Sequence, residues 1–304
     1  MTGHHVVLCA IADDDQGPGL LDFATNLALE AGYELVVAHV VETRGPARMR
    51  PGSRSAAAPT ALLSRDLGHA ARLGRADGEE LLRGLGVDDE IAVVALGNPC
   101  EQLLRLAREC DAALLVVGTR GRGAMRGALL GTLSRSLTTR GDTPVVVVHP
   151  EAASGPTPAS VICGVAGTLD DALAVARVAA ELAGRLELPL TLAHVLETNE
   201  DLDAQSDVSL SALLDDDGWR ALRLTRHVVD DVTDRVDAHA VLRRGDPAHE
   251  LAALGREHDA ALVVVGCHRH RAARTLLVGS VSLDLCRRAR RPVITVPIGA
   301  RRAG

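Results

Sequence analysis

The chain contains one long pattern twice. The stretch LGNPCEQLLRLARECDAALLVVG, residues 96–118, aligns with RGDPAHELAALGREHDAALVVVG, residues 244–266, at an offset of 148 residues. A repeat of about 150 residues has the size of a domain and is too long for a solenoid unit. The segment HPEAASGPTPAS, residues 149–160, is rich in Pro, Ala, Gly and Ser and reads as a linker. We therefore expect two similar domains, at residues 1–150 and 159–304.

Each repeat alternates short apolar runs with longer segments of helical period. The first repeat predicts strands near 5–11, 34–41, 90–95, 112–118 and 144–148, and helices near 18–31, 60–85, 99–109 and 132–140. The second predicts strands near 160–165, 189–196, 236–242, 260–266 and 292–297, with helices between them. Continuous apolar strands alternating with helices indicate an α/β fold, a doubly wound parallel sheet covered on both faces.

Such sheets bind ligands beyond the carboxyl ends of their strands, where the strand order switches. Ala12, His39 and Gly118 each stand at the end of a predicted strand. We therefore expect a ligand site near these three residues.

The composition argues against several functions. Only 1% of the residues are aromatic and the net charge is −7, which disfavours nucleic-acid binding by base stacking and backbone contacts. All 33 basic residues are Arg, so a Walker-type phosphate loop and Schiff-base chemistry on lysine are excluded. The six cysteines form no CxxC pair, and no apolar run reaches the roughly 18 residues of a membrane span. We expect a soluble, reduced, cytoplasmic protein.

A glycine-rich segment follows the fourth predicted strand. Gly118, Gly121 and Gly131 form the pattern G-2x-G-9x-G, and Thr132 follows directly, where a helix begins. Glycines let backbone N–H groups approach an anion, and a helix start offers unpaired N–H groups. The hydroxyls of Thr132 and Ser134 add donors, and nearby arginines add charge. The pattern suits a polyphosphate, although a simple glycine-rich crossing with solvated arginines would also contain these residue types.

A Rossmann dinucleotide fingerprint does not fit this segment. The spacing in GRGAMRG is GxGxxxG, and the loop follows the fourth strand instead of the first. The acidic partner for the ribose is also missing at the required distance.

The repeat, the strand end VVGTRGRG, the helix start GTLSRSL and the last strand TPVVVV together resemble the universal stress protein family in its tandem two-domain form. The resemblance covers nearly the whole chain. It implies two five-stranded domains of strand order 3-2-1-4-5, which pair through their last strands, within one chain or between chains. It also implies membership of the ATP-binding subclass that carries the glycine motif.

The resemblance implies a nucleotide site in the first domain. On its phosphate and ribose side the matching residues are Gly118, Arg120, Gly121, Gly131, Thr132, Leu133 and Ser134. Val40 matches the position whose backbone contacts the adenine. The family's Asp at the end of the first strand falls on Ala12, and Asp13 would replace it if the turn is shifted by one residue. ATP, with or without Mg²⁺, is the expected ligand.

The second domain departs further from the family pattern. The Asp position is Ala166, and the second glycine of the motif is Arg269, whose side chain would obstruct the approach of backbone to phosphate. The remaining matches are Val195, Gly266, Gly279, Ser280 and Ser282. We therefore expect a degenerate nucleotide motif here.

Other candidate chemistry is weaker. Cys267, His268 and His270 are competent metal ligands, but they need a fourth ligand from elsewhere, and a solvated basic loop explains them equally simply. The run DDD at residues 13–15 would suit Mg²⁺, whereas the same run at 215–217 reads as a solvated helix face. We predict no metal site and find no catalytic set of nucleophile and base.

Three functions remain open from the sequence. The first is a stress-response regulatory module that binds ATP or another adenine nucleotide in its first domain and signals through contacts with a protein partner. The second is a structural or interaction module in which both nucleotide sites are degenerate. The third is a slow ATPase or autophosphorylating protein, with Thr132 or Ser134 as the acceptor.

Overall fold

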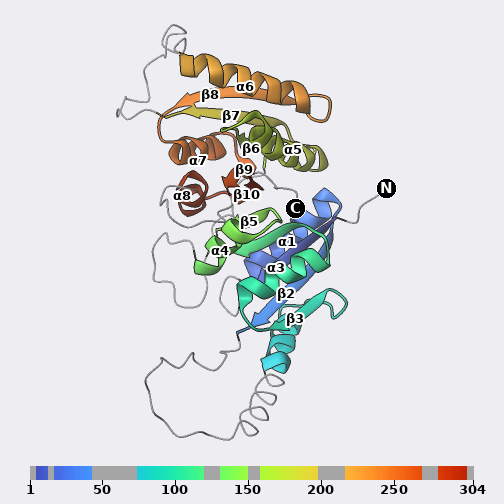
Figure 1. Cartoon of the computed structure of the whole chain (residues 1–304). Helices are drawn as coiled ribbons and strands as arrows, with labels where there is room; N and C mark the ends of the chain where they lie inside the picture. Colours follow the sequence, from blue (N-terminus) through green and yellow to red (C-terminus); the bar gives the residue numbers. More distant parts are fainter. Residues whose placement is uncertain are drawn as a thin grey trace, which may run out of the picture.

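The computed structural model describes residues 5–12, 17–42, 74–119, 131–149, 158–197, 216–268 and 280–299. We call residues 5–149 the first half and residues 158–299 the second half. Strands from both halves form one ten-stranded sheet (Figure 1). Those of the first half are β1 (Val6–Ile11), β2 (Glu34–Val41), β3 (Ala92–Leu96), β4 (Ala112–Gly118) and β5 (Val145–Val148). Those of the second half are β6 (Ser160–Gly164), β7 (Leu190–Leu196), β8 (Ala238–Arg244), β9 (Ala260–His268) and β10 (Val293–Ile298).

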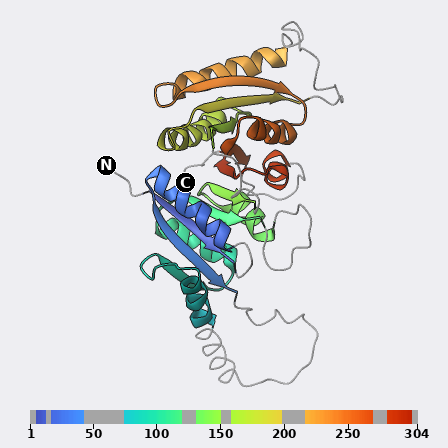
Figure 2. The same ribbon diagram turned by 180° about the vertical axis from the view of Figure 1, so that it is seen from behind.

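The strand order is β3-β2-β1-β4-β5-β10-β9-β6-β7-β8. Each half has the order 3-2-1-4-5 and parallel neighbours, so the predicted α/β doubly wound fold is confirmed. The two last strands, β5 and β10, pair antiparallel, with Val147 opposite Val293 and Val145 opposite Thr295. Figure 2 shows the two halves meeting along this seam. An unpaired edge strand tends to associate with other chains. At the seam, each last strand has its partner inside the chain, so neither edge is exposed.

Helices cover both faces of the sheet. The described helices are α1 (Gly17–Ala31), α3 (Pro99–Glu109), α4 (Thr132–Arg140), α5 (Leu169–Arg185), α6 (Asp216–Val232), α7 (Pro247–Glu257) and α8 (Ser280–Arg288), together with helical residues 74–84. The helix predicted at 60–85 is described only in this last part. One core cluster packs under α1, 74–84, α5 and α6, and a second packs under α3, α4, α7 and α8. None of these helices is long and apolar enough to cross a membrane.

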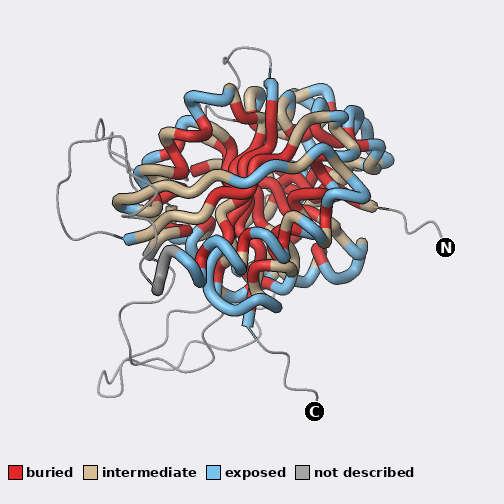
Figure 3. Tube along the Cα trace, turned by 90° about the horizontal axis from the view of Figure 1, so that it is seen from above, coloured by how far each residue is buried: buried red, intermediate tan, exposed pale blue. Residues whose placement is uncertain are grey.

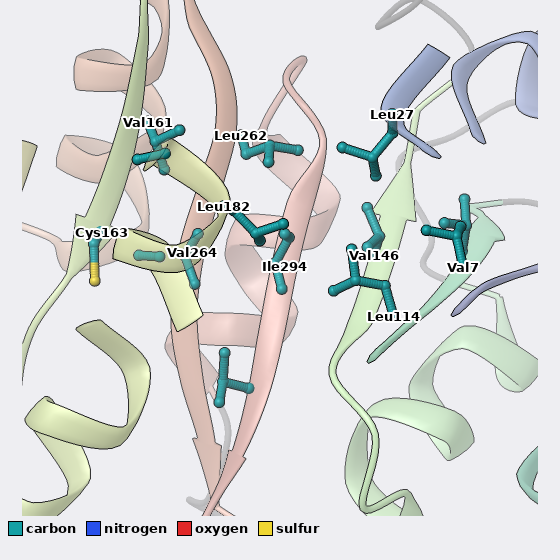
Figure 4. Close-up of a cluster of buried hydrophobic side chains, with 14 of the residues drawn as sticks. Val7, Leu27, Leu114, Val146, Val161, Cys163, Leu182, Leu262, Val264 and Ile294 are labelled. Carbon is teal, nitrogen blue, oxygen red and sulfur yellow. The ribbon is translucent and has the colours of Figure 1, made fainter. Parts of the chain in front are cut away.

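Both clusters run through the seam between the halves. On the first face, Leu114 and Val146 from the first half share one cluster with Leu262 and Ile294 from the second. Figure 4 shows these side chains lying on both sides of the seam, and Figure 3 shows buried backbone through the middle of the molecule. Burial on both faces explains why the strands are continuous runs of Val, Leu and Ile. The apolar contact across the seam stabilises the two halves as one body.

The repeat seen in the sequence is also a repeat of backbone conformation. Gly97 has φ 131° and Gly245 has φ 133°, a region that side chains strain to adopt. One residue later, Asn98 and Asp246 each accept a hydrogen bond from a backbone N–H in the first turn of α3 or α7. A proline follows each cap, as expected at the first helical position. The two halves therefore use the same turn chemistry at equivalent places.

Polar contacts also join the halves away from the sheet. Arg185 at the end of α5 donates to the carbonyl oxygen of Ala31, the last residue of α1, over 3.0 Å. Its guanidinium carbon lies 4.6 Å from the centroid of the Tyr33 ring. The Tyr33 hydroxyl in turn donates to Glu181 over 3.3 Å. These contacts hold α1 of the first half against α5 of the second.

Candidate functional site

The strand order places the predicted site residues of the first half at one edge of the sheet. β1 has β2 on one side and β4 on the other, so the order switches between β1 and β4. Ile11 lies opposite His39, and Ala10 lies opposite Val117. Ala12, Val40 and Gly118 therefore lie at the carboxyl ends of three neighbouring strands. This edge is where open α/β sheets bind ligands.

The N-terminus of α4 lies at the same edge. Gly131 precedes the helix, and its N–H donates to the carbonyl oxygen of Thr119 over 2.9 Å. No side chain in the described part of the chain caps α4, whereas α3, α5 and α7 each have a capping side chain. The N–H groups of Thr132, Leu133 and Ser134 therefore lack acceptors within the helix and favour an anion.

Ser134 has a role that its motif position did not indicate. The side chain is 3% exposed, and its hydroxyl donates to the carbonyl oxygen of Gly118 over 2.8 Å. A serine hydroxyl carries one hydrogen, so that hydrogen is committed to the backbone of β4. Ser134 therefore offers a ligand its backbone N–H, while its side chain fixes α4 to β4.

Thr119 is a residue of the site that the sequence reasoning missed. It follows Gly118 and occupies a variable position of the glycine pattern, so the motif gives no reason to select it. Its side chain is 6% exposed, and its Oγ1 has no hydrogen-bond partner among the described residues. A hydroxyl directly after a buried apolar strand is the one signal that would have found it.

His39 is held in place as a packing residue. Its Nδ1 lies 2.9 Å from the carbonyl oxygen of Ile11, and the residue is 9% exposed. Because a carbonyl only accepts, Nδ1 carries the hydrogen of this contact. A Cβ added to Gly78 would lie 3.0 Å from His39 Cδ2 and 2.9 Å from Val94 Cγ1. The glycine therefore lets helical residues 74–84 approach the carboxyl end of β2.

The adenosine side of the predicted site has little polar chemistry in the described residues. Ala12 is half-buried and supplies no carboxylate at the end of β1. Asp13, Arg120 and Gly121 lie outside the described residues. Val40 contributes backbone groups and a half-buried side chain. The described donors therefore cluster on the α4 side.

The second half keeps the architecture with different contacts. A Cβ added to Gly266 would lie 2.7 Å from Ile298 Cδ1, so core packing alone explains this glycine. Cys267, the counterpart of Thr119, has a hydrogen bond with Ser282 that lowers its pKa, although burial has the larger effect and raises the pKa overall. Val195 lies in β7, and Gly279 and Arg269 fall outside the described residues.

In the described part of the second half, the other titratable groups form no metal-binding cluster. Burial lowers the pKa of His194, and a backbone hydrogen bond with Val165 partly opposes this. Among the described residues, no group of three or more His, Cys, Asp or Glu side chains would hold a metal ion. The candidate ligand His270 lies outside that set.

Comparison with known proteins shows the family to which this chain belongs. The family model described as the universal stress protein family matches residues 3–149 and again residues 160–297. The chain belongs to the universal stress protein family. Universal stress protein Rv2005c of Mycobacterium tuberculosis is 30% identical over 227 residues, which cover 69% of this chain and 70% of the relative. The tandem arrangement read from the repeat is thereby confirmed.

A solved universal stress protein shares the fold of the whole chain. A universal stress protein from Archaeoglobus fulgidus aligns with 98% of this chain and 100% of its own, with a TM-score of 0.62 and 16% identity. A second structure, of the universal stress protein from the same organism in complex with dAMP, aligns with 45% of this chain and 97% of its own, with a TM-score of 0.35 and 21% identity.

Proposed function

We propose that this universal stress protein binds ATP or another adenine nucleotide in its first half and acts as a regulatory module of the stress response. One observation carries the proposal: α4 begins against the end of β4, at the switch point of the sheet, and no described side chain caps it. Three backbone N–H groups and the positive end of a helix dipole meet there, which favours a phosphate.

The residues present fit the phosphate part of a nucleotide. The N–H groups of Thr132, Leu133 and Ser134 would bind phosphate oxygens, and the hydroxyl of the exposed Thr132 would add a donor. Thr119, whose hydroxyl has no partner among the described residues, contacts the residue before α4, because its carbonyl oxygen accepts from the N–H of Gly131. The negative phosphates of a bound nucleotide would interact favourably with the positive N-terminal end of α4. Mg²⁺ would accompany the phosphates of ATP.

The base would be held mainly by backbone. Val40 would present its N–H and C=O groups to the adenine at the end of β2, and Ala12 would add only a small apolar contact. Affinity would then depend on the phosphates more than on the base. ATP should therefore bind more tightly than adenosine.

We propose a structural role for the second half. Gly266 is explained by packing against Ile298, and Ala166 supplies no carboxylate at the end of β6. The second half extends the sheet through β10 and carries the contact from Arg185 to α1. Conformational changes caused by a ligand in the first half would be passed through these contacts to the second half, where a protein partner would bind.

Titration of a fluorescent ATP analogue tests the proposed site. Wild type should show saturable binding, and Gly131→Val should lower the affinity at least tenfold by obstructing the approach of phosphate to α4. The matched control is Gly279→Val, the equivalent change in the second half, which should leave the affinity unchanged. Absence of saturable binding by wild type, or equal loss in both variants, would contradict the proposal.

An interaction module without nucleotide is the second candidate. It is favoured by Ala12 and Ala166, because both positions lack the carboxylate that the family places at the end of the first strand. Competition separates the two candidates. Displacement of the analogue by ATP and ADP, but weakly by adenosine, supports the nucleotide site, whereas displacement by none of them supports the interaction module.

A further inference from the structure

We propose that Thr119 is a ligand-binding residue of the first half and donates its hydroxyl hydrogen to a phosphate oxygen held at the N-terminus of α4. This inference rests on the proposed nucleotide site and names a residue outside the glycine motif. It also explains one buried polar atom that has no partner among the described residues.

Thr119 is fixed in position by its backbone. Its N–H donates to the carbonyl oxygen of Val148 over 3.1 Å, which extends the pairing of β4 with β5. Its carbonyl oxygen accepts from the N–H of Gly131, the residue that precedes α4. Both backbone groups are therefore satisfied, and only the side-chain hydroxyl remains available.

The side chain of Thr119 lies on the face of the sheet that α4 covers. Side chains alternate along a strand, so Thr119 shares a face with Val117 and Leu115. Both belong to the core cluster that contains Leu137 of α4, and Leu133 packs against the same cluster. The Ser134 hydroxyl reaches Gly118, the neighbour of Thr119, over 2.8 Å. The carbonyl oxygen of Thr119 accepts from the N–H of Gly131, so the residue with the orphaned hydroxyl lies next to the first turn of α4.

Thr119 is an exception among the buried hydroxyl groups of the described chain. Ser134, Ser160, Thr191, Thr225 and Thr295 each have a hydrogen-bond partner. Leaving a buried hydroxyl unpaired is unfavourable, so a group without a partner among the described residues is a candidate donor to a ligand. A phosphate oxygen at α4 would accept its hydrogen.

The second half lacks this open donor. Cys267 stands at the equivalent position; its thiol donates to the carbonyl oxygen of His268 over 3.9 Å, and a hydrogen bond with Ser282, the equivalent of Ser134, acts to lower its pKa. The pair is satisfied inside the protein, and burial raises the pKa of the Cys267 thiol. A neutral thiol is a weak donor to phosphate. The two halves therefore differ at this position: the first half has the hydroxyl of Thr119 near α4, and the second half has the thiol of Cys267 near α8.

Two readouts on Thr119→Val, Thr119→Ser and Cys267→Val test the inference. Valine has the shape of threonine without the hydroxyl, so Thr119→Val should raise the melting temperature of the ligand-free protein by about 2–4 °C. The same variant should weaken binding of the ATP analogue about tenfold. Thr119→Ser should retain wild-type affinity within about threefold, since it keeps the donor. Cys267→Val is the second-half control and should bind as wild type does.

The outcomes separate this inference from the proposed function. Saturable binding by wild type with equal affinity for Thr119→Val would overturn the role of Thr119 and leave the nucleotide site standing. Equal losses of affinity in Thr119→Val and Thr119→Ser would also overturn it, because the shape of the threonine side chain, and not its hydroxyl, would then determine binding. Absence of binding by wild type would overturn both. A lower melting temperature for ligand-free Thr119→Val would overturn the orphaned state of the hydroxyl on which the inference depends.

Discussion

Ser134, in the first turn of α4, donates its hydroxyl hydrogen to the carbonyl oxygen of Gly118, at the end of β4, over 2.8 Å. The contact joins two parts of the glycine motif that are 16 residues apart in the chain. It holds the start of α4, which no described side chain caps, at the strand end where the phosphate would lie. The motif serine therefore fixes α4 to β4 through its side chain.

Ser134→Ala should destabilise the protein by about 1–3 kcal/mol, because the carbonyl of Gly118 loses a part-buried hydrogen bond. Urea unfolding at constant slope measures this change. The ATP analogue should also bind more weakly, as the helix end loses its fixed position. Ser136→Ala, on the same helix and only partly buried, is the control and should change neither quantity measurably. Equal stability of Ser134→Ala and wild type would contradict the role given to this hydroxyl.

Gly266→Ala should destabilise the second half by about 1–3 kcal/mol through overpacking. The added Cβ would lie 2.7 Å from Ile298 Cδ1 and 3.1 Å from Val175 Cγ2. Ile298→Val removes the nearer methyl group and by itself should cost about 0.5–1.5 kcal/mol. The double variant should therefore be more stable than the sum of the single effects predicts. Thermal unfolding of the four proteins measures the coupling, and strict additivity would show that this clash does not occur.

Arg185→Met should loosen the contact between the halves. Arg185 supplies a donor to the carbonyl at the end of α1, a helix with no basic residue in its own last turn, and lies over Tyr33. We expect a loss of about 1 kcal/mol, since the group is partly exposed and such contacts are screened. Arg177→Met breaks an exposed ion pair with Asp231 inside the second half and is the control. A larger change in thermal unfolding for the control would contradict the importance of the contact.

Stability should fall as the pH rises above about 9. Burial raises the pKa of Cys9 from 9.0 to about 12 and raises the pKa values of Cys163 and Cys286 as well. Burial, helped by Glu181, raises the pKa of Tyr33 from 10.0 to about 12. As the pH rises, these groups lose their protons at a lower pH in the unfolded chain than in the folded protein. Their contribution to the free energy of unfolding is therefore complete below the pKa of the unfolded state and is lost as the pH rises toward the pKa of the folded state.

Urea unfolding under reducing conditions from pH 8 to 10.5 measures this loss. Each group makes the free energy of unfolding fall more steeply with pH, by up to about 1.4 kcal/mol per pH unit. Cys9→Ala should make the slope shallower above pH 9, and Tyr33→Phe should do so only above pH 10. A stability that stays constant over this range would show that the thiols ionise equally in both states.

Much of the fold followed from local patterns. The repeat at a constant offset predicted two equivalent halves, and alternating apolar runs and helical segments predicted the parallel, doubly covered sheet. Strand and helix bounds agree closely where both are defined, for example α3 at Pro99–Glu109 and β4 at Ala112–Gly118. These features depend on spacing between neighbouring residues, which the sequence displays directly.

The sequence by itself determined the α/β class, the duplication and the glycine motif that resembles a phosphate site. Only the tertiary structure decided what individual polar atoms do: the hydroxyl of Ser134 is committed to Gly118, that of Thr119 is buried without a described partner, and Gly266 is required by Ile298. The physical reason is that hydrogen-bond partners and close packing are set by residues far apart in the chain. A motif specifies residue types and spacing, whereas the donor available to a ligand depends on what the fold has already satisfied.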